Sequence, residues 1–494
     1  MNVINIGMRR ELFVDRMLID RMVGVSFRLH EPVSGGVVLQ NDKPWEGPGN
    51  FGMSVIDVGD RLLMYYRGWS LKDAADQIGV GCVAESRDGG ATWTKPGLNR
   101  VTTPDWPDNN IIVEYEGKPR IASPCGPWVD TRPGVPAHER IKMMRSEPLS
   151  GETHTAMRDP AGPKRLVFWA SADGFTFRKL DPQPEMVSHL PGCFDGGNTL
   201  FWSEAEGQYV LYYRWCEDGS NGPCRTVARA TSKDLMTWAP SEPMTYGDTP
   251  REQFYTNSTQ PYFRAPHLYV ALAARFMEGR RALTVAQGEA VGLVSAIGAF
   301  PWDWTRDCSD GALLTSRAGS TVYDRTFMET FIRPGLGSGN WTSRSNYPLT
   351  GILPTGEERI QFFVSRRYLQ AAWHIERLLL RTDGFASAST PWAGGEMLSA
   401  PFIFAGNALE INYRTGAPGF VRVEIQDAAC RPISGHTLDA CPEIVGDEIA
   451  RIVAWKRNAD VSRLAGQPVR LRFVMKDADL FSFRFYDGQK AADE

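Results

Sequence analysis

The sequence predicts an all-β protein, with a five-bladed β-propeller followed by a C-terminal β-sandwich. A short turn-like string recurs at residues 86–93, 171–177 and 232–238, with weaker copies at 316–320 and 381–385. Strand-like runs that end in aromatic residues and Arg precede most copies, at 62–67, 209–214 and 360–366. Repeated strands with Asp-Gly turns are typical of propeller blades, so five units predict five blades around a central pocket.

Each predicted unit opens with an asparagine before an apolar, β-branched or aromatic run. These residues are Asn50, Asn110, Asn198, Asn257 and Asn346. Their uneven spacing predicts long loops in units two and four, and residues 132–163 have the Pro- and Gly-rich composition of an inserted loop. A propeller must also close its ring to avoid an unpaired edge, and residues 11–15 are the segment expected to complete the last blade.

A change of pattern near residue 386 predicts the domain boundary. We expect residues 1–385 to form the propeller and residues 391–494 to form the sandwich, with a linker around 386–395. Alternating apolar and polar residues at 409–413, 421–425, 469–474 and 481–485 predict half-exposed antiparallel strands. The second domain is expected to support the propeller.

Composition narrows the class of protein. The 494 residues carry a net charge of −4, and no long basic run is present, which argues against a nucleic-acid partner. We find neither a signal-peptide pattern nor an 18-residue apolar stretch, so we expect a cytoplasmic protein without a membrane partner. The eight cysteines lack CxxC spacing and the histidines are dispersed, so no metal site or cofactor is expected. The sequence neither indicates nor excludes a structural Ca²⁺ ion in the propeller channel.

The architecture resembles the five-bladed glycoside hydrolases of the invertase, fructanase and arabinanase group, which are glycosyl hydrolase family 32/43-like proteins. Strings at residues 11–15, 18–20, 44–47, 255–257 and 260–262 carry the resemblance. Residues 158–160, Arg-Asp-Pro, match a string that holds a transition-state-stabilising carboxylate in invertase-like enzymes, which implies Asp159. The Asp-Gly turns are similar to sialidase Asp boxes, which are structural.

The sequence also departs from that group. Invertase-like enzymes carry a Trp-Met-Asn-Asp-Pro string with the nucleophile and a Glu-Cys pair with the acid, and both strings are absent here. The nucleophile and the acid therefore cannot be carried over from the resemblance.

Carboxylates beside the unit openings are the candidates for catalysis, because glycosidic hydrolysis needs an acid and a base or nucleophile. Asp195, Glu252, Glu46 and Asp108 occupy such positions, and Asp159 joins them through the resemblance. Each has a structural alternative: Asp195 could build an Asp-Gly turn, and the others could be loop carboxylates. Asp88, Asp173 and Asp234 are interpreted as turn residues.

Sugar binding usually adds aromatic platforms and amide or hydroxyl hydrogen-bonding groups. The candidates for substrate binding are Trp45, Asn198, Tyr255, Asn257, Gln260, Asn346 and Tyr347. The alternative for the repeated asparagines is that they cap strand ends.

These observations predict an exo-acting glycoside hydrolase that uses paired carboxylates in the propeller pocket on a small carbohydrate. A sialidase-like hydrolase, a polysaccharide lyase and a non-catalytic binding propeller remain alternatives. A sialidase would need three arginines that converge on a carboxylate-binding site. Arg67, Arg214 and Arg366 follow the aromatic strand ends, so we expect a structural role for these three instead. The oligomeric state, the sugar and the linkage stay open.

Overall fold

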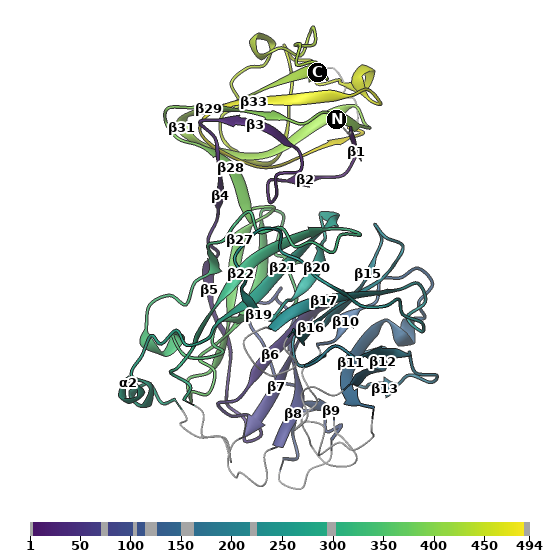
Figure 1. Ribbon diagram of the computed structural model, residues 1–494, viewed down its shortest axis with the longest axis vertical. Coiled ribbons are helices and arrows are strands. Elements are labelled where there is room, and N and C mark those ends of the chain that lie inside the picture. Colours follow the sequence, from purple (N-terminus) through teal and green to yellow (C-terminus); the bar gives the residue numbers. More distant parts are fainter. Residues whose placement is uncertain are drawn as a thin grey trace.

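The computed structural model confirms the all-β prediction. It describes residues 3–70, 78–101, 106–113, 126–149, 163–217, 225–293 and 303–488. Five small sheets form the lower body in Figure 1, and a ten-stranded sheet forms the upper body, where both chain termini lie. The five sheets are the blades of the predicted propeller.

Each blade is an antiparallel sheet of four or five strands. Blade one contains β6 (Phe51–Asp57), β7 (Leu62–Ser70), β8 (Ile78–Ser86) and β9 (Ile111–Val113). Blade two contains β10 (Trp128–Val129), β11 (Ile141–Pro148), β12 (Lys164–Ser171), β13 (Arg178–Lys179) and β14 (Met186–Ser188). Blade three contains β15 (Thr199–Ser203), β16 (Gln208–Cys216), β17 (Arg225–Ser232) and β18 (Glu242–Pro243).

Blades four and five complete the ring. Blade four contains β19 (Gln253–Thr256), β20 (Thr259–Tyr262), β21 (Ala265–Met277), β22 (Cys308–Arg317) and β23 (Thr330–Ile332). Blade five contains β24 (Tyr347–Pro348), β25 (Leu353–Pro354), β26 (Arg359–Arg366), β27 (His374–Arg381) and β5 (Val33–Gln40). Within the described residues, the helix α2 (Val285–Ala290) and the 3₁₀ turns Ala137–Glu139, Ser338–Asn340, Leu438–Ala440 and Ser462–Leu464 lie outside the strands.

The N-terminal part of the chain closes the ring, but through a different segment from the one expected. β5 pairs antiparallel with β27 and supplies the outer strand of blade five. The expected segment, residues 11–15, instead begins with β2 (Glu11–Leu12), which pairs with β33 (Val469–Tyr486) of the upper sheet. Leu12 and Val14 pack into the apolar core of blades four and five, whereas Phe13 packs into the core of the upper sheet. This segment therefore joins the two bodies.

The second unit also opens at a different place. The prediction took Asp108–Asn110 as its start, but these residues precede β9, which pairs with β8 as the outer strand of blade one. The first strand of blade two is the two-residue β10. A two-residue strand gives no periodic signal, whereas 111–113 is a clear apolar run.

The upper body is a ten-stranded sheet whose N-terminal strands were not expected there. It contains β1 (Ile4–Gly7), β2, β3 (Ile19–Val23), β4 (Ser26–Leu29), β28 (Ala386–Thr390), β29 (Gly395–Ser399), β30 (Phe402–Phe404), β31 (Ala408–Asp427), β32 (Asp447–Ile452) and β33. β31 and β33 pair along most of their lengths, with a break in register between Thr415 and Phe420. The sheet encloses one apolar core. Residues 4–29 therefore pair with this C-terminal domain, although residues 1–385 were expected in the propeller.

The recurrent turns are built by aspartate side chains. Asp88 Oδ1 accepts hydrogen bonds from the backbone N–H groups of Ala91 (3.1 Å) and Thr92 (2.9 Å), and the Trp93 indole donates to Gly90 O at 3.1 Å. Asp173 and Asp234 accept equivalent bonds after β12 and β17. All three turns follow the third strand of their blade.

We expect Asp88→Ala to lower the free energy of unfolding by about 1–2 kcal/mol, because the turn N–H groups lose their acceptor. Chemical denaturation measures this loss, and Glu204→Ala, at an exposed carboxylate between β15 and β16, is the control. Equal stability of the Asp88 variant and the wild type would contradict a structural role for the turn.

Buried ion pairs join the C-terminal domain to the propeller. The buried Asp383 carboxylate accepts hydrogen bonds from Tyr262 Oη and from Ser482 Oγ, both at 2.7 Å, which links blade four to β33. Glu11, 2% exposed, lies 2.9 Å from Arg317 Nη1 and 3.2 Å from His267 Nε2. Burial works to raise the pKa of Glu11, but His267, Arg317 and Arg9 outweigh it and lower that pKa to about 2.

This interface predicts a pH dependence of stability. A carboxylate with a lowered pKa stabilises the fold fully above its ordinary pKa of 4.5, and the contribution is lost as the pH falls towards about 2. Glu11→Gln should lower the free energy of unfolding by about 1–3 kcal/mol near neutral pH and flatten its decline between these pH values. Urea unfolding across that window measures both effects, with Glu31→Gln, at an exposed carboxylate, as the control. An unchanged slope in Glu11→Gln would contradict the assignment.

Candidate functional site

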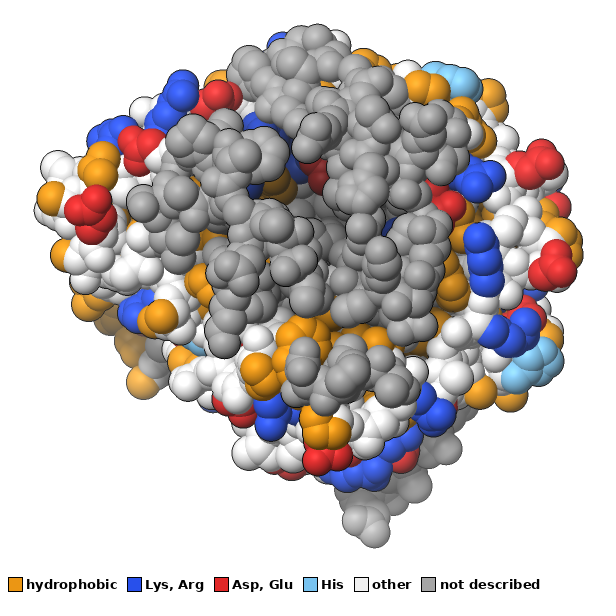
Figure 2. Space-filling model, turned by 90° about the horizontal axis from the view of Figure 1, so that it is seen from below, with side chains coloured by type: hydrophobic (Ala, Val, Ile, Leu, Met, Phe, Trp, Pro, Cys, Tyr) orange, Lys and Arg blue, Asp and Glu red, His pale blue; other side chains and the backbone are white. Residues whose placement is uncertain are grey.

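The candidate site lies at the end of the blades away from the C-terminal domain. Asp195 precedes β15, Arg214 lies near the end of β16 and Arg225 begins β17, so all three lie at one end of blade three. The contacts with the C-terminal domain come from the opposite strand ends, where Asp383 follows β27. Figure 2 shows the propeller face away from that domain, with Lys and Arg side chains interspersed with Asp and Glu along its margin.

An arginine–tyrosine cluster is the central feature of this site. It consists of Asp195, Arg214, Arg225, Tyr255 and Arg344, which come from blades three and four and the segment before blade five. Asp195 and Arg214 form an ion pair. The Arg214 guanidinium carbon lies 4.5 Å from the centroid of the Tyr255 ring. Segments far apart in the sequence thus meet at one point, as expected for a propeller pocket.

Two more arginines complete the cluster around the same tyrosine. The guanidinium carbons of Arg225 and Arg344 lie 5.1 Å and 5.4 Å from the Tyr255 ring centroid. Arg344 also lies 4.8 Å from the ring of Trp304. Because an aromatic face attracts cations, the Tyr255 ring holds three positive charges near its own hydroxyl group.

The cluster shifts the pKa of its two reactive groups. Partial desolvation works to raise the pKa of Asp195, but Arg214, Lys164 and Arg344 outweigh it, so that pKa lies below its ordinary value. Burial also works to raise the pKa of Tyr255, and again Arg344 and Arg214 outweigh it and lower the pKa. Asp195 remains 49% exposed, so solvent can reach the carboxylate. The site offers an ionised carboxylate beside a tyrosine that gives up its proton more readily than usual.

Residues with a left-handed backbone conformation occur in the cluster and beside it in the sequence. Phe194, before Asp195, has a φ of 59°, and Arg344 itself has a φ of 58°. Ser258 and Asn346 also have positive φ angles, 46° and 67°. Such conformations are uncommon outside glycine and cost free energy, which the surrounding structure must supply.

Glu252 and Glu46 are both committed to ion pairs outside the cluster. Glu252 binds Arg275 through Oε1 and Arg325 through Oε2, each at 2.6 Å. Glu46 binds Lys95 at 2.8 Å and accepts a hydrogen bond from Tyr66 Oη at 2.5 Å. These contacts favour the structural alternative for both carboxylates.

The other two carboxylate candidates are not brought to the cluster by the described structure. Asp108 is exposed before the outer strand of blade one. Asp159 lies outside the described residues.

The repeated asparagines form hydrogen bonds within the protein. Asn257 accepts from Thr199 Oγ1 at 3.0 Å and donates to Gly197 O at 2.8 Å. Asn346 accepts from Arg366 at 2.6 Å, and Asn198 donates to Phe194 O at 3.1 Å. These bonds agree with strand-end capping, which the sequence left open.

Tyr347, Gln260 and Trp45 are the remaining candidates for sugar binding. Tyr347 lies beside the cluster, with its ring centroid 5.2 Å from that of Tyr255. Gln260 accepts a hydrogen bond from Ile352 N at 3.2 Å. Trp45 is buried in the core of blade one and donates to Asn110 Oδ1 at 3.0 Å, so its ring presents no open face for a sugar.

The three arginines suggested by the strand-end pattern do not converge. Arg366 binds Glu376 at 2.8 Å, and Arg67 donates to Gly49 O at 2.9 Å. Arg214 instead joins Arg225 and Arg344, which the sequence analysis missed. Arg225 could have been found as the partner of Arg214, because it opens the strand that pairs with β16, but Arg344 lies in an irregular segment with no periodic signal.

The described residues contain neither a cluster of metal ligands nor a membrane-spanning helix. Within the described residues, no group of three or more His, Cys, Asp or Glu side chains is arranged to hold a metal ion. In the same part of the chain, no helix combines the length and apolarity needed to cross a bilayer.

A separate cavity lies in the C-terminal domain. It has a volume of about 460 Å³ and is lined by Asp20, Arg21, Leu398, Gln426, Cys430 and Arg472. Its charged groups are engaged in ion pairs, Asp20 with Arg470 at 2.5 Å and Arg472 with Glu396 at 2.6 Å. We therefore place the candidate site at the propeller cluster.

Comparisons with known proteins give similarity at the level of structure alone. No family model matches the chain, and no curated protein matches its sequence. A solved structure described as a glycoside hydrolase is 12% identical, covering 71% of this chain and 92% of its own, with a TM-score of 0.47. A β-1,2-mannobiose phosphorylase from Listeria innocua is 9% identical (70% and 96% covered, TM-score 0.41). An N-acetylgalactosamine deacetylase from F. plautii is 10% identical (74% and 97% covered, TM-score 0.44). Similarity this low does not transfer an activity to the chain.

Proposed function

We propose that this protein cleaves the glycosidic bond of a terminal sugar at the arginine–tyrosine cluster. The observation that carries the proposal is the convergence of Asp195 and Tyr255, from two blades, on Arg214. Glycosidic cleavage needs one group that accepts a proton and another that donates one. The lowered pKa of Tyr255 suits proton donation, and the lowered pKa of Asp195 keeps that carboxylate ionised.

Each residue has a defined part in the proposed hydrolysis. The Asp195 carboxylate takes a proton from water, whose oxygen bonds to the anomeric carbon. The bond between that carbon and the leaving oxygen breaks, and the Tyr255 hydroxyl donates its proton to the leaving oxygen. Tyr255 replaces the second carboxylate expected from the sequence, since Glu252 and Glu46 are held in ion pairs. Exchange with solvent then restores both protonation states.

A lyase is the second candidate, and one observation favours it. Among the described residues, Asp195 is the only carboxylate that forms an ion pair with a member of the cluster beside the tyrosine. In a lyase, a base would remove the proton next to the carboxylate of an acidic sugar, and elimination would break the bond to the leaving oxygen without water. The product sugar would then contain a carbon–carbon double bond.

Product analysis tests the proposal and separates the two reactions. The protein is incubated with a panel of neutral and acidic oligosaccharides, and the products are identified by mass spectrometry. A saturated sugar that gains an oxygen atom from labelled water supports hydrolysis, and an unsaturated product without the label supports a lyase. If none of the panel is cleaved, the proposed function is contradicted.

A further inference from the structure

We propose that Arg214 and Arg344 bind the carboxylate of a sugar acid, so that the substrate is a glycoside with an acidic terminal sugar. This inference rests on the proposed function and specifies its substrate class. It is carried by the charge balance of the cluster, by guanidinium nitrogens without partners and by the aromatic surfaces beside them.

The positive charge of the cluster exceeds its negative charge. Besides Arg225, whose Nη1 donates to Gln253 Oε1 at 2.8 Å, the cluster holds two positive charges, on Arg214 and Arg344, and one negative charge, on Asp195. Within the described residues Arg344 forms no ion pair, and its guanidinium lies between the rings of Tyr255 and Trp304. Charges removed from water are normally paired, and among the described residues no carboxylate pairs with Arg344, so this arginine can bind an anionic ligand.

Three donor nitrogens of the two arginines also lack an acceptor among the described residues. Arg214 is 2% exposed, and it contacts Asp195 through Nη2 alone. In the described part of the chain, its Nε and Nη1 atoms and the Nε atom of Arg344 are buried without a hydrogen-bond acceptor. A buried donor without an acceptor costs free energy, and a carboxylate can accept two bonds from a guanidinium group. A bound carboxylate would therefore satisfy the groups that are now without partners.

The surroundings indicate that the anion belongs to a sugar. The half-buried Tyr255 ring lies directly beside the arginines, and the buried Tyr347 ring packs behind it with 5.2 Å between centroids. Aromatic faces pack against the apolar face of a sugar ring, whereas a free inorganic anion has no use for them. A sugar acid presents both parts together: a ring for the aromatic side chains and a carboxylate for the arginines.

Binding measurements test the inference without requiring catalysis. Isothermal titration calorimetry compares glucuronate and galacturonate with glucose, galactose and inorganic phosphate on the full chain. We expect at least one uronate to bind at least about tenfold more tightly than its neutral counterpart, as charged hydrogen bonds imply, and more tightly than phosphate. Equal affinity for acidic and neutral sugars overturns the inference, and so does tighter binding of phosphate.

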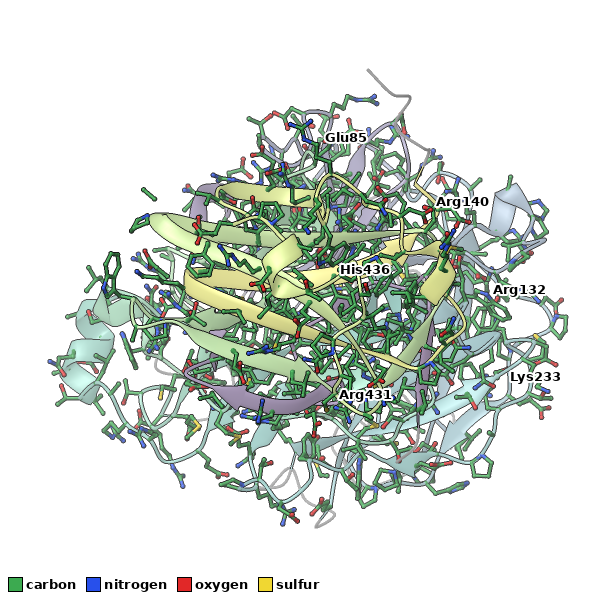
Figure 3. The ribbon with its side chains drawn as sticks, turned by 90° about the horizontal axis from the view of Figure 1, so that it is seen from above. Glu85, Arg132, Arg140, Lys233, Arg431 and His436 are labelled. Carbon is green, nitrogen blue, oxygen red and sulfur yellow. The ribbon has the colours of Figure 1, made fainter. Side chains whose placement is uncertain are left out.

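Variants assign the effect to the cluster. Arg344→Gln should lower uronate affinity at least about tenfold, and Arg344→Lys should retain part of it because the charge remains. The control is Arg431→Gln, at an arginine of the C-terminal domain that is labelled in Figure 3 and has a side chain 79% exposed. Thermal melting identifies any variant that fails to fold. In that case the calorimetric comparison of uronates, neutral sugars and phosphate on the wild-type protein tests the inference by itself.

The outcomes separate this inference from the proposed function. Cleavage of neutral glycosides with no preference for acidic ones would overturn the sugar-acid assignment and leave the proposed function standing. Tight binding of uronates without cleavage of any uronate glycoside would contradict the proposed function and support the binding site. Unchanged uronate affinity in folded Arg344→Gln would show that another part of the chain binds the acid.

Discussion

Replacing Asp195 with asparagine should lower kcat for glycosidic cleavage by about 10²–10⁴-fold. The amide cannot accept the proton from water, while its size and its position beside Arg214 are preserved. KM should change little, because the sugar is held by other groups of the cluster. Steady-state kinetics on the best substrate of the panel measure the effect.

The Asp195 variant needs a control for charge and for folding. Asp60→Asn removes a carboxylate in the turn between β6 and β7, where the Asp60 side chain is 63% exposed, and should leave kcat unchanged. The thermal midpoint of Asp195→Asn should fall, because Arg214, whose side chain is 2% exposed, loses its carboxylate partner, so kcat is compared at a temperature at which the variant is folded. Wild-type kcat in the folded Asp195 variant would exclude this residue as the base.

Tyr255→Phe should lower kcat by a similar factor, about 10²–10⁴-fold, because it removes the proposed proton donor while keeping the ring. Tyr347→Phe is a matched control, since the two rings lie 5.2 Å apart and burial raises the pKa of Tyr347 well above its ordinary value. The Tyr347 variant should therefore retain most of the wild-type kcat. Equal losses in the two variants would mean that the aromatic environment, and not proton donation by Tyr255, is what matters.

The pH–rate profile should carry the signature of the same tyrosine. A proton donor must be protonated, so activity should fall as the pH rises through the pKa of Tyr255. Arg344→Gln removes a positive charge that lowers this pKa, so the alkaline limb of the profile should move to higher pH. An unmoved limb in a folded Arg344 variant would argue against Tyr255 as the donor.

The sequence predicted the fold well because the relevant signals are local. The turn strings at 86–93, 171–177 and 232–238 do follow the third strands of blades one, two and three, and the aromatic runs lie in central strands of blades one, three and five. Ring closure and the N-terminal boundary were predicted less well. Both depend on which distant edges pair, as β5 does with β27 and β2 with β33, and one sequence does not determine such pairings.

Part of the candidate site was also predictable, because local sequence signals mark the openings of the units. Asp195 and Tyr255 lie at the openings of predicted units, where a propeller brings chain segments together. Arg344 has no periodic context, and its importance arises from a left-handed backbone and contacts with two rings. Glu46 and Glu252 had the right residue type, but their arginine and lysine partners could be recognised only in three dimensions.

A crystal structure of the Asp195→Asn protein with an uncleaved uronate glycoside tests the central claim most directly. We expect the glycosidic oxygen to lie within hydrogen-bond distance of Tyr255 Oη, and the sugar carboxylate to contact the guanidinium groups of Arg214 and Arg344. A glycoside bound elsewhere, for example in the cavity of the C-terminal domain beside Arg472, would contradict this claim.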